Sequence, residues 1–385
     1  MDKQTTYTNL LMAGCRVEQA CFTAAGGGRE VQLMLHVAEC AQSYEEQLQT
    51  LLDVYDTLLL GPLQGYQAVF KRFFLSDAAN QKERLLAALP DNMACATSIV
   101  QQPPLDGTKV ALWAYFIEGA VTQMLPGGLS ETCHGAYRHL WGGGSVNRAA
   151  NAEYQMRLLF QEYVMQLMEQ GGRLADNCIR TWIFVHDVDT NYAGVVKARN
   201  EVFATQQLTS ATHFIASTGI NGSAGDAAVK VLFDTYAVLG ILPGQVHHLY
   251  APTHLNPTYE YGVSFERGSY VEYGDRRQVF ISGTASINNK GEVVHPGDVR
   301  KQTEWMWENV AALLTEAECS FSDVQQMIVY LRDTADYQVV RSLFEARFPA
   351  VPKVFLWAPV CRPGWLIEME CMAVKRVENE CYPSF

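Results

Sequence analysis

Residues 299–333 read VRKQTEWMWENVAALLTEAECSFSDVQQMIVYLRD, and this stretch decides the fold. Its first half carries apolar residues at spacings of three and four, which is typical of an amphipathic helix. Its second half, DVQQMIVYLRD at 323–333, is rich in β-branched and other apolar residues and ends in an Asp. That composition predicts a buried strand directly after the helix.

The same order of features occurs twice more, earlier in the chain. Helical patterns cover residues 44–60 and 152–170, and strand patterns at 66–77 and 177–187 follow them. A second helix and two further strands follow in each copy. A Gln in the first helix is spaced 30, 32 and 31 residues from the Asp that ends the strand: Gln47 to Asp77, Gln155 to Asp187, and Gln302 to Asp333. Three intervals that match this closely indicate an internal repeat.

The repeat predicts an α+β architecture. Each unit of about 120 residues reads strand-strand-helix-strand-helix-strand-strand, which places both helices on one face of a mixed sheet and leaves the other face apolar. Three units in one chain can cover these faces mutually, so we predict a single-chain pseudo-trimer with ligand clefts at the seams. Gly- and Pro-rich stretches at 125–135 and 250–262 suggest three units: 1–125, 133–250 and 262–385. We expect a monomer or a weak homodimer.

Charge and composition exclude several classes of protein. Of 385 residues, 48% are hydrophobic and 18% are charged, which is typical of a well-packed globular protein. The net charge is -12, and the Lys and Arg residues are not clustered, so a nucleic-acid partner is not expected. No apolar run approaches the ~18 residues of a membrane-spanning helix. The N-terminal residues lack a secretory signal pattern, so we expect a soluble, cytoplasmic protein with no membrane partner.

No motif in the sequence calls for a metal or an organic cofactor. The sequence His186-Asp187-x-Asp189 ends a predicted strand and lacks a spaced third ligand. The pairs His247–His248 and His134 with His139 are no better spaced. The Gly runs at 26–28 and 142–144 have no Lys-Ser/Thr context for phosphate binding. We therefore expect no metal site and no cofactor.

The third unit resembles the RidA/YjgF family, also called endoribonuclease L-PSP. The resemblance rests on VFISGTASINNKGEVVHPGDVRKQTEWMWENVAALLTEAECSFSDVQQMIVYLRD (279–333) and on IEME (367–370), and it covers residues 265–375. It is weaker in the second unit and reduced to a pattern in the first. It implies trimers of this unit with sites between subunits. Deaminases of this family bind the substrate carboxylate with an Arg fifteen residues before the strand Glu. Lys353 stands at that spacing and lacks the two-pronged grip of a guanidinium.

A second resemblance, to the chorismatases, covers residues 180–375. It is carried by RTWIFVHDVD, the helix with Arg199 and Asn200, ASTGING, YGVSFERG, FISGTASI, HPGDV and VCRPGWLIEME. Before the Phe-x-Arg segment, NPTYEYGVSFERG departs from the Pro/Arg-rich run of those enzymes. The resemblance implies a RidA-like chain that hydrolyses chorismate without a cofactor.

Glu368 is the candidate catalytic residue. It lies in an otherwise apolar strand, and alternation places Glu368 and Glu370 on the same face of the sheet. Two buried carboxylates on one face are costly unless they are paired, and one of them is then held protonated. A protonated carboxyl group is the general acid that an enol ether needs. The alternative is that both side chains face solvent and pair with Lys or Arg.

Further residues are candidates for binding a small anionic carboxylate ligand. Two fixed cations are needed for a dicarboxylate, and Arg362 and Arg267 are the first choices, followed by Arg332. Cys361 is expected to line the pocket rather than to act as a nucleophile. The Gly at position 283 would let backbone amides approach a carboxylate. The remaining candidates are an aromatic wall, a small-residue loop and a strand end of the second unit: Phe265, Tyr261, Ser282, Gly283, Thr284, Ala285, Ser286, Ser217, Thr218 and Gly219.

Four functions remain open from the sequence. The first is a chorismatase-like hydrolase or lyase that releases pyruvate from chorismate or a related enolpyruvyl or cyclic carboxylic acid. The second is a RidA-type enamine/imine deaminase, against which Lys353 argues. The third is a non-catalytic ligand-binding protein, because Ala111 and Val231 stand about where Glu368 stands in the third unit. A nuclease is the weakest, given the acidic charge.

Overall fold

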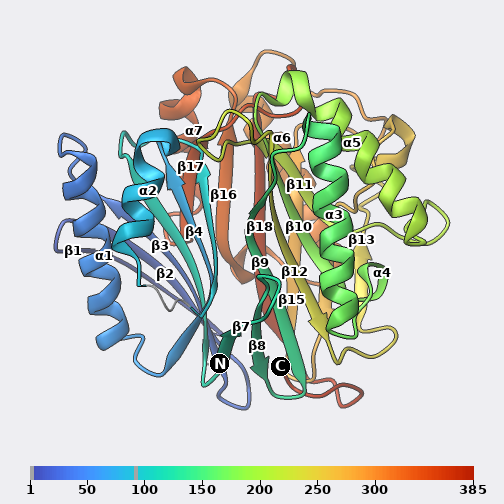
Figure 1. Cartoon of the computed structure of the whole chain (residues 1–385), viewed down its shortest axis with the longest axis horizontal. Coiled ribbons are helices and arrows are strands. Elements are labelled where there is room, and N and C mark those ends of the chain that lie inside the picture. The colour runs from blue at the N-terminus through green and yellow to red at the C-terminus, as the bar shows by residue number, and fades with distance from the viewer. Residues whose placement is uncertain (1–3, 91–93) are drawn as a thin grey trace.

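The computed structural model describes residues 4–90 and 94–385 and contains three six-stranded sheets, one per unit (Figure 1). The first unit consists of β1 (Thr5–Met12), β2 (Cys15–Thr23), β3 (Arg29–Val37), α1 (Tyr44–Leu60), β4 (Tyr66–Leu75), α2 (Ala78–Ala88), β5 (Ala96–Gln101) and β6 (Val110–Glu118). The second consists of β7 (Val121–Met124), β8 (Ser130–His134), β9 (Tyr137–Val146), α3 (Ala152–Glu169), α4 (Leu174–Asn177), β10 (Cys178–Val185), α5 (Val188–Thr205), β11 (Ala216–Asn221) and β12 (Val231–Leu239).

The third unit has the same plan with short 3-10 turns added. It consists of β13 (Val246–Leu249), η1 (Thr258–Tyr261), β14 (Gly268–Glu272), β15 (Arg276–Ala285), α6 (Val299–Glu316), η2 (Phe321–Asp323), β16 (Val324–Leu331), η3 (Thr334–Asp336), α7 (Tyr337–Arg347), β17 (Lys353–Trp357) and β18 (Ile367–Arg376). Three strands, rather than the two expected, precede the first long helix of each unit. The strand order β1-β2-β3-β6-β4-β5 recurs as β13-β14-β15-β18-β16-β17 and, in reverse, as β11-β10-β12-β9-β8-β7.

The repeated Gln has one structural role in all three units. Gln47, Gln155 and Gln302 are completely buried at the first turn of α1, α3 and α6. Each side-chain amide donates to backbone carbonyls that precede its helix, at 2.8–3.3 Å. Each side-chain oxygen accepts a hydrogen bond from a backbone N–H just before the last strand of its unit in the chain. These N–H groups belong to Lys109, Lys230 and Leu366, before β6, β12 and β18. The Gln therefore ties the helix to the sheet and satisfies groups that burial would otherwise leave unpaired.

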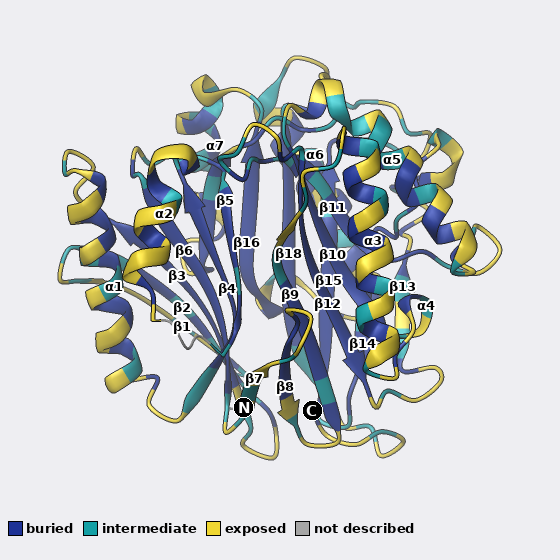
Figure 2. Ribbon diagram, viewed as in Figure 1, coloured by how far each residue is buried: buried dark blue, intermediate teal, exposed yellow. Residues whose placement is uncertain are grey.

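The three sheets face inward and the helices lie outside, as predicted (Figure 2). One continuous hydrophobic cluster contains residues from the inner faces of all three sheets. Phe70 of β4 lies 5.0 Å from Trp141 of β9, and Tyr236 of β12 lies 5.4 Å from Phe280 of β15, between ring centroids. Burying a large apolar side chain contributes about 1.5–3 kcal/mol, so this shared core holds the units together.

Strand pairing places the boundaries between the units earlier in the chain than the Gly- and Pro-rich stretches suggest. β7 (121–124) pairs with β8 in the second sheet, and β13 (246–249) pairs with β14 in the third. The stretch at 125–135 instead contains the turn of the β7–β8 hairpin, where Gly127 and Gly128 adopt a positive φ of 95°. A tight turn inside a hairpin requires the same residues as a boundary between units, so composition alone did not distinguish them.

The covered inner faces lead to a prediction about assembly. Because each sheet buries its apolar face against the other two within one chain, we expect a monomer or a weak dimer of the 43.0 kDa chain. Light scattering should give about 43 kDa at low concentration. A stable species near three times that mass would contradict the prediction. No helix in the described ranges is both long and apolar enough to cross a membrane.

Candidate functional site

A small cavity lies at the seam between the second and third units. Its walls come from α5, β11, the segment 261–267, β15 and the segment 361–368. The space between the side chains is about 30 Å³, close to the volume of one water molecule. The lining residues are Tyr192, Arg199, Ser217, Gly219, Tyr261, Val263, Phe265, Arg267, Gly283, Ala285, Ile287, Cys361, Arg362, Trp365 and Glu368.

Glu368 reaches this cavity from β18, where it is opposite Ala285 of β15 and Tyr330 of β16. Its side chain is buried, and no hydrogen bond to its carboxyl group is present among the described residues. Burial, together with repulsion from the Glu370 carboxylate, raises the pKa of Glu368 to about 8, and the nearby Arg180 and Arg267 only partly oppose this. At neutral pH the carboxyl group is therefore mostly protonated, which is the state that a general acid requires.

Gly283 makes room for this carboxyl group. A Cβ at position 283 would lie 2.1 Å from Oε1 of Glu368, so no larger residue fits without moving the acid. The position lies in an irregular stretch of the β15–β18 ladder, between Ile281 and Thr284. The N–H of Gly283 donates to Oγ1 of Thr218 at 2.9 Å. The expectation that this amide faces a ligand is therefore wrong: it joins the second and third units.

Two buried guanidinium groups face the cavity from opposite units. Arg199 of α5 is 1% exposed, and its Nε and Nη2 have no hydrogen-bond partner among the described residues. Arg267 is 4% exposed and donates through Nη2 to the backbone oxygen of Asn256 at 2.9 Å, whereas its Nε is unpartnered. Both lie beside the ring of Phe265, at 5.9 and 5.4 Å from its centroid. Unpartnered buried cations are costly, and an anionic ligand would offset that cost.

The outer wall of the cavity is aromatic and carries a third cation. Arg362 is exposed and lies over the rings of Tyr261 and Trp365, at 5.0 and 5.4 Å. Behind it, burial raises the pKa of the Cys361 thiol to about 12, so this thiol is protonated and is not a nucleophile at neutral pH. Across the cavity, Gly219 admits the ring of Tyr192, whose Cε2 would lie 2.8 Å from a Cβ there.

Several predicted residues lie outside the cavity wall. Arg332 forms an ion pair with Asp189 and donates to the backbone oxygen of Val360. Ser282 accepts from the backbone N–H of Ser217 at 2.9 Å and donates to the oxygen of Glu266. Hydrogen bonds also occupy three other hydroxyl groups: Thr218, Thr284 and Ser286. Arg332, Ser282 and Thr218 bond across the seam, whereas Thr284 and Ser286 bond within the third unit.

Lys353 lies in a different seam from Glu368. It is the first residue of β17 and lines a cavity between the third and first units. Strand pairing identifies the residue of the second unit that corresponds to Lys353. Lys353 of β17 pairs with Met327 of β16, and Ser217 of β11 pairs with Thr181 of β10. Met327 and Thr181 lie at the same distance from the ends of their strands, so Ser217 corresponds to Lys353. Ser217, not Lys353, therefore faces the Glu368 cavity. Strand pairing also gives the residues that correspond to Glu368, which are Ala111 in the first unit and Leu232 in the second. Ala111 is the expected residue, whereas Leu232 follows the expected Val231 by one position.

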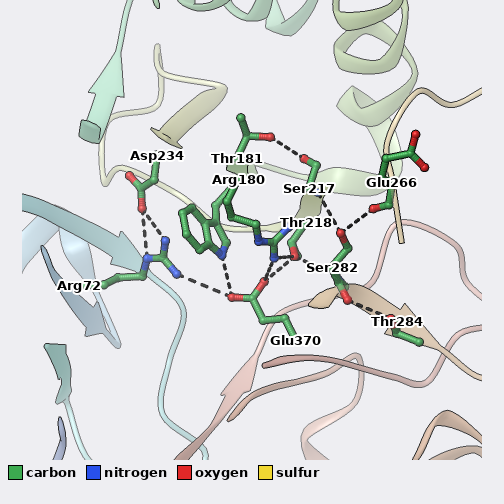
Figure 3. A network of polar contacts seen from close by, with 12 residues as sticks. Arg72, Arg180, Thr181, Ser217, Thr218, Asp234, Glu266, Ser282, Thr284 and Glu370 are labelled. Carbon is green, nitrogen blue, oxygen red and sulfur yellow. Dashed lines mark hydrogen bonds and ion pairs between the residues drawn. The ribbon is translucent and has the colours of Figure 1, made fainter. Parts of the chain in front are cut away.

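Behind the cavity, Glu370 joins all three units through a buried network (Figure 3). Its carboxylate lies 2.8 Å from Nη2 of Arg180 and accepts from Nε1 of Trp182 at 2.8 Å. It also accepts from the hydroxyl of Thr218. Arg72 of the first unit lies 3.9 Å away and pairs with Asp234 at 2.8 Å. The two carboxylates of β18 thus share a face, as predicted, but only Glu370 is paired.

Arg199 is the charged residue of the cavity that sequence reasoning missed as a site residue, and Tyr192, Val263, Ile287 and Trp365 are the other lining residues that it did not name. The signal for Arg199 is a charged residue among the buried positions of a helix, beside Ala198 and Val202. No group of three or more His, Cys, Asp or Glu that could hold a metal ion occurs among the described residues. The donors that line the cavity are guanidinium, hydroxyl and indole groups, which suit an anion rather than a cation.

Comparison with known proteins places this geometry in a family. The family model described as "Endoribonuclease L-PSP" matches residues 265–375. A RutC family protein of Pyrococcus abyssi is 34% identical over 100 residues, which cover 25% of this chain and 78% of that protein. The 3-aminoacrylate deaminase RutC of Acinetobacter baylyi is 30% identical over 97 residues, or 25% of this chain and 77% of that enzyme.

Likeness to a solved structure can extend beyond a single unit. A chorismatase crystal structure has a TM-score of 0.63 and 20% identity, covering 80% of this chain and 92% of that chain. The likeness shows that the two chains share the fold. The third unit, with its relatives of 30–34% identity, shows that this chain belongs to the endoribonuclease L-PSP family, also called RidA/YjgF.

Proposed function

We propose that the protein is a chorismatase-like enzyme that releases pyruvate from chorismate or a related enolpyruvyl carboxylic acid at the Glu368 cavity. The observation that carries the proposal is a buried carboxyl group with a pKa of about 8, in one cavity with two buried arginines. A protonated acid beside fixed cations suits a substrate that is an anion and that reacts by accepting a proton. The fold shared with a chorismatase adds support.

The chemistry follows from the proton on Glu368. The acid donates this proton to the methylene carbon of the enol ether, which leaves a cation stabilised by the ether oxygen. Water adds to the cationic carbon, and the hemiketal collapses to pyruvate and the ring alcohol. The proton that water releases returns to Glu368, so the step balances without a cofactor. Arg199 and Arg267 would hold the substrate carboxylates, and protein positioning of this kind lowers the barrier further.

Ligand entry requires movement of the outer wall. A cavity of about 30 Å³ is smaller than any cyclic dicarboxylate. Arg362 is exposed on the segment between β17 and β18, and it lies over the half-buried ring of Tyr261, the last residue of η1. We expect these two side chains to move apart when the substrate enters.

A direct assay tests the proposal and separates it from its alternatives. Purified protein is incubated with chorismate, and pyruvate is measured with lactate dehydrogenase. Pyruvate release that depends on Glu368 supports the proposal, and its absence at high enzyme concentration contradicts it. Ammonia release from 3-aminoacrylate would instead indicate the deaminase activity for which the Acinetobacter baylyi relative is named. Binding of chorismate without turnover would indicate a non-catalytic ligand-binding protein.

The cavity also predicts which arginine matters most for binding. Arg199→Ala should weaken substrate binding by about 2–5 kcal/mol, because it removes a desolvated partner of a buried carboxylate. Arg362→Ala is the matched control, since an exposed ion pair is worth about 1 kcal/mol or less. Titration calorimetry with a non-reacting substrate analogue measures both losses. Equal losses for the two variants would contradict this assignment of the carboxylate to the buried arginine.

A further inference from the structure

The outer face of α3 exposes a stripe of large apolar side chains. Tyr154, Leu158, Met165 and Met168 are 44–65% exposed, at positions where a surface helix typically shows polar residues. Together with Gln161 they follow one another at spacings of four, three, four and three residues. An average spacing of about 3.5 places all five on one line along the helix, as in the seam of a coiled coil. Figure 2 shows exposed positions, in yellow, along the outer side of α3.

The other two units supply an internal comparison for this stripe. Counted from the repeated buried Gln, the four apolar positions of α3 have equivalents on α1 and α6. Three of the four residues on α1 are polar, and on α6 two are polar and two are only partly exposed. The stripe is therefore not required by the fold, because two units adopt the same fold without it. The equivalent residues are, on α1 and then on α6: Glu46, Thr50, Thr57 and Leu60, and Lys301, Trp305, Ala312 and Thr315.

A shallow groove of about 600 Å³ borders the stripe, between α3 and α5. Both of its charged lining residues are already paired within the chain: Arg157 pairs with Glu201, and also with Glu153 at 2.9 Å. A partner that binds through charge, such as an anionic lipid surface, would therefore find no free cation among the residues that line the groove. An uncharged apolar ridge suits it better. The lining residues are Arg157, Gln161, Val164, Met165, Glu201, Val202, Thr205 and Gln206.

We propose that α3 pairs with α3 of a second copy of this chain, antiparallel and around a two-fold axis that passes beside Gln161. The stripe is nearly symmetric about Gln161. In an antiparallel pair Tyr154 therefore faces Met168 of the second copy and Leu158 faces Met165, and each contact occurs twice, as a two-fold interface requires. A single polar residue in such a seam fixes its register, and the two Gln161 amides can bond each other across the axis.

The area available on this face agrees with a weak, reversible dimer. The 18 residues of α3 make a helix about 27 Å long, and a strip about 11 Å wide along it covers about 300 Å² on each copy. If the α5 side of the groove doubles this area, the two copies together bury on the order of 1,200 Å², the lower limit for a stable interface. Glu162 is exposed beside Gln161, so the two Glu162 carboxylates lie near the axis and oppose tighter association.

Light scattering of the full chain over a range of concentrations tests the proposal. The mass of the wild type should rise with concentration from 43.0 kDa toward twice that value. Met165→Glu places a charge in the seam and should weaken the dimer about a hundred-fold or more, since the charge loses its water without gaining a partner. Thr57→Glu is the matched control: it adds the same charge at the equivalent exposed position of α1 and should associate like the wild type. Both side chains are exposed, so both variants should fold.

Cross-linking tests the register of the pair. A two-fold axis brings equal residues together, so Gln161→Cys should form a covalent dimer when its thiols are oxidised with diamide. Asp53→Cys, at the equivalent position of α1, should form no more covalent dimer than the wild type, whose exposed cysteines set the background. The proposal is overturned if the wild type stays at 43.0 kDa at the highest concentration reached, or if Met165→Glu associates as the wild type does. Equal cross-linking of Asp53→Cys and Gln161→Cys would also overturn it.

Discussion

Replacing Glu368 by Gln should lower the rate of pyruvate release from chorismate by about 10²–10⁴-fold, the usual contribution of a positioned general acid. The substitution keeps the shape of the side chain and removes only the transferable proton. Because the carboxyl group is mostly neutral in the folded protein, a neutral amide should leave substrate binding nearly unchanged. The loss should therefore appear in kcat rather than in KM.

The pH dependence follows from the same group. With a pKa of about 8, wild-type activity should be high below pH 8 and should fall about ten-fold per pH unit above it. The folded-state pKa lies above the ordinary value of 4.5, so the native state holds a proton that the unfolded chain releases. Stability should therefore fall as the pH rises from about 4.5 to 8, and this fall should be absent from Glu368→Gln.

Thermal unfolding of the wild type and of Glu368→Gln at pH 6 and pH 9 is the control. It measures the predicted fall of stability with pH, and it shows whether the variant is folded when its activity is assayed. The variant should melt at least as high as the wild type at pH 9, because it no longer has to release a buried proton. Undiminished pyruvate release by a folded Glu368→Gln would contradict the role of the acid. A wild-type pH profile that is flat from pH 6 to 10 would contradict its raised pKa.

The repeat was predictable because each unit uses a buried Gln to bond the same backbone positions. Gln47, Gln155 and Gln302 bridge a helix to the last strand of their sheets, so their spacing to the next strand could not vary much. The strand preceding the predicted pair in each unit was not predictable in the same way. β1 reads TTYTNLLM and is mostly exposed, and β7 and β13 have four residues each. Edge strands of this kind bury too little surface to show an alternating pattern.

The candidate site was predictable where the information is local. Alternation along one strand placed Glu368 and Glu370 on the same face, and burial of that face followed from the apolar neighbours. The role of Arg199 was not local, since its burial depends on Phe265, 66 residues away and in another unit. Lys353 shows the same limit. Its spacing to Glu368 in the chain is fixed, but the order of the units around the core places the two in different seams.

Replacing Glu370 by Gln should destabilise the protein by about 3–5 kcal/mol, the usual effect of removing one partner of a buried ion pair. Arg180 is 1% exposed and would lose the carboxylate that lies 2.8 Å from its Nη2. The amide group of Gln would also place a donor against Arg180 or Thr218, which are donors themselves. Urea unfolding, followed by tryptophan fluorescence, measures the change through Trp182, which donates to the same carboxylate.

A double-mutant cycle separates this ion pair from general damage to the core. Arg180→Met removes the cation and leaves Glu370 buried with Trp182, Thr218 and the more distant Arg72. If the pair is the cause, the double variant Arg180→Met/Glu370→Gln should be less destabilised than the sum of the two single variants, because neither charge is then left alone. A loss of less than 1 kcal/mol for Glu370→Gln, or strict additivity, would show that Glu370 does not hold the seam. In that case the hydrophobic cluster shared by the three sheets would be sufficient to join the units.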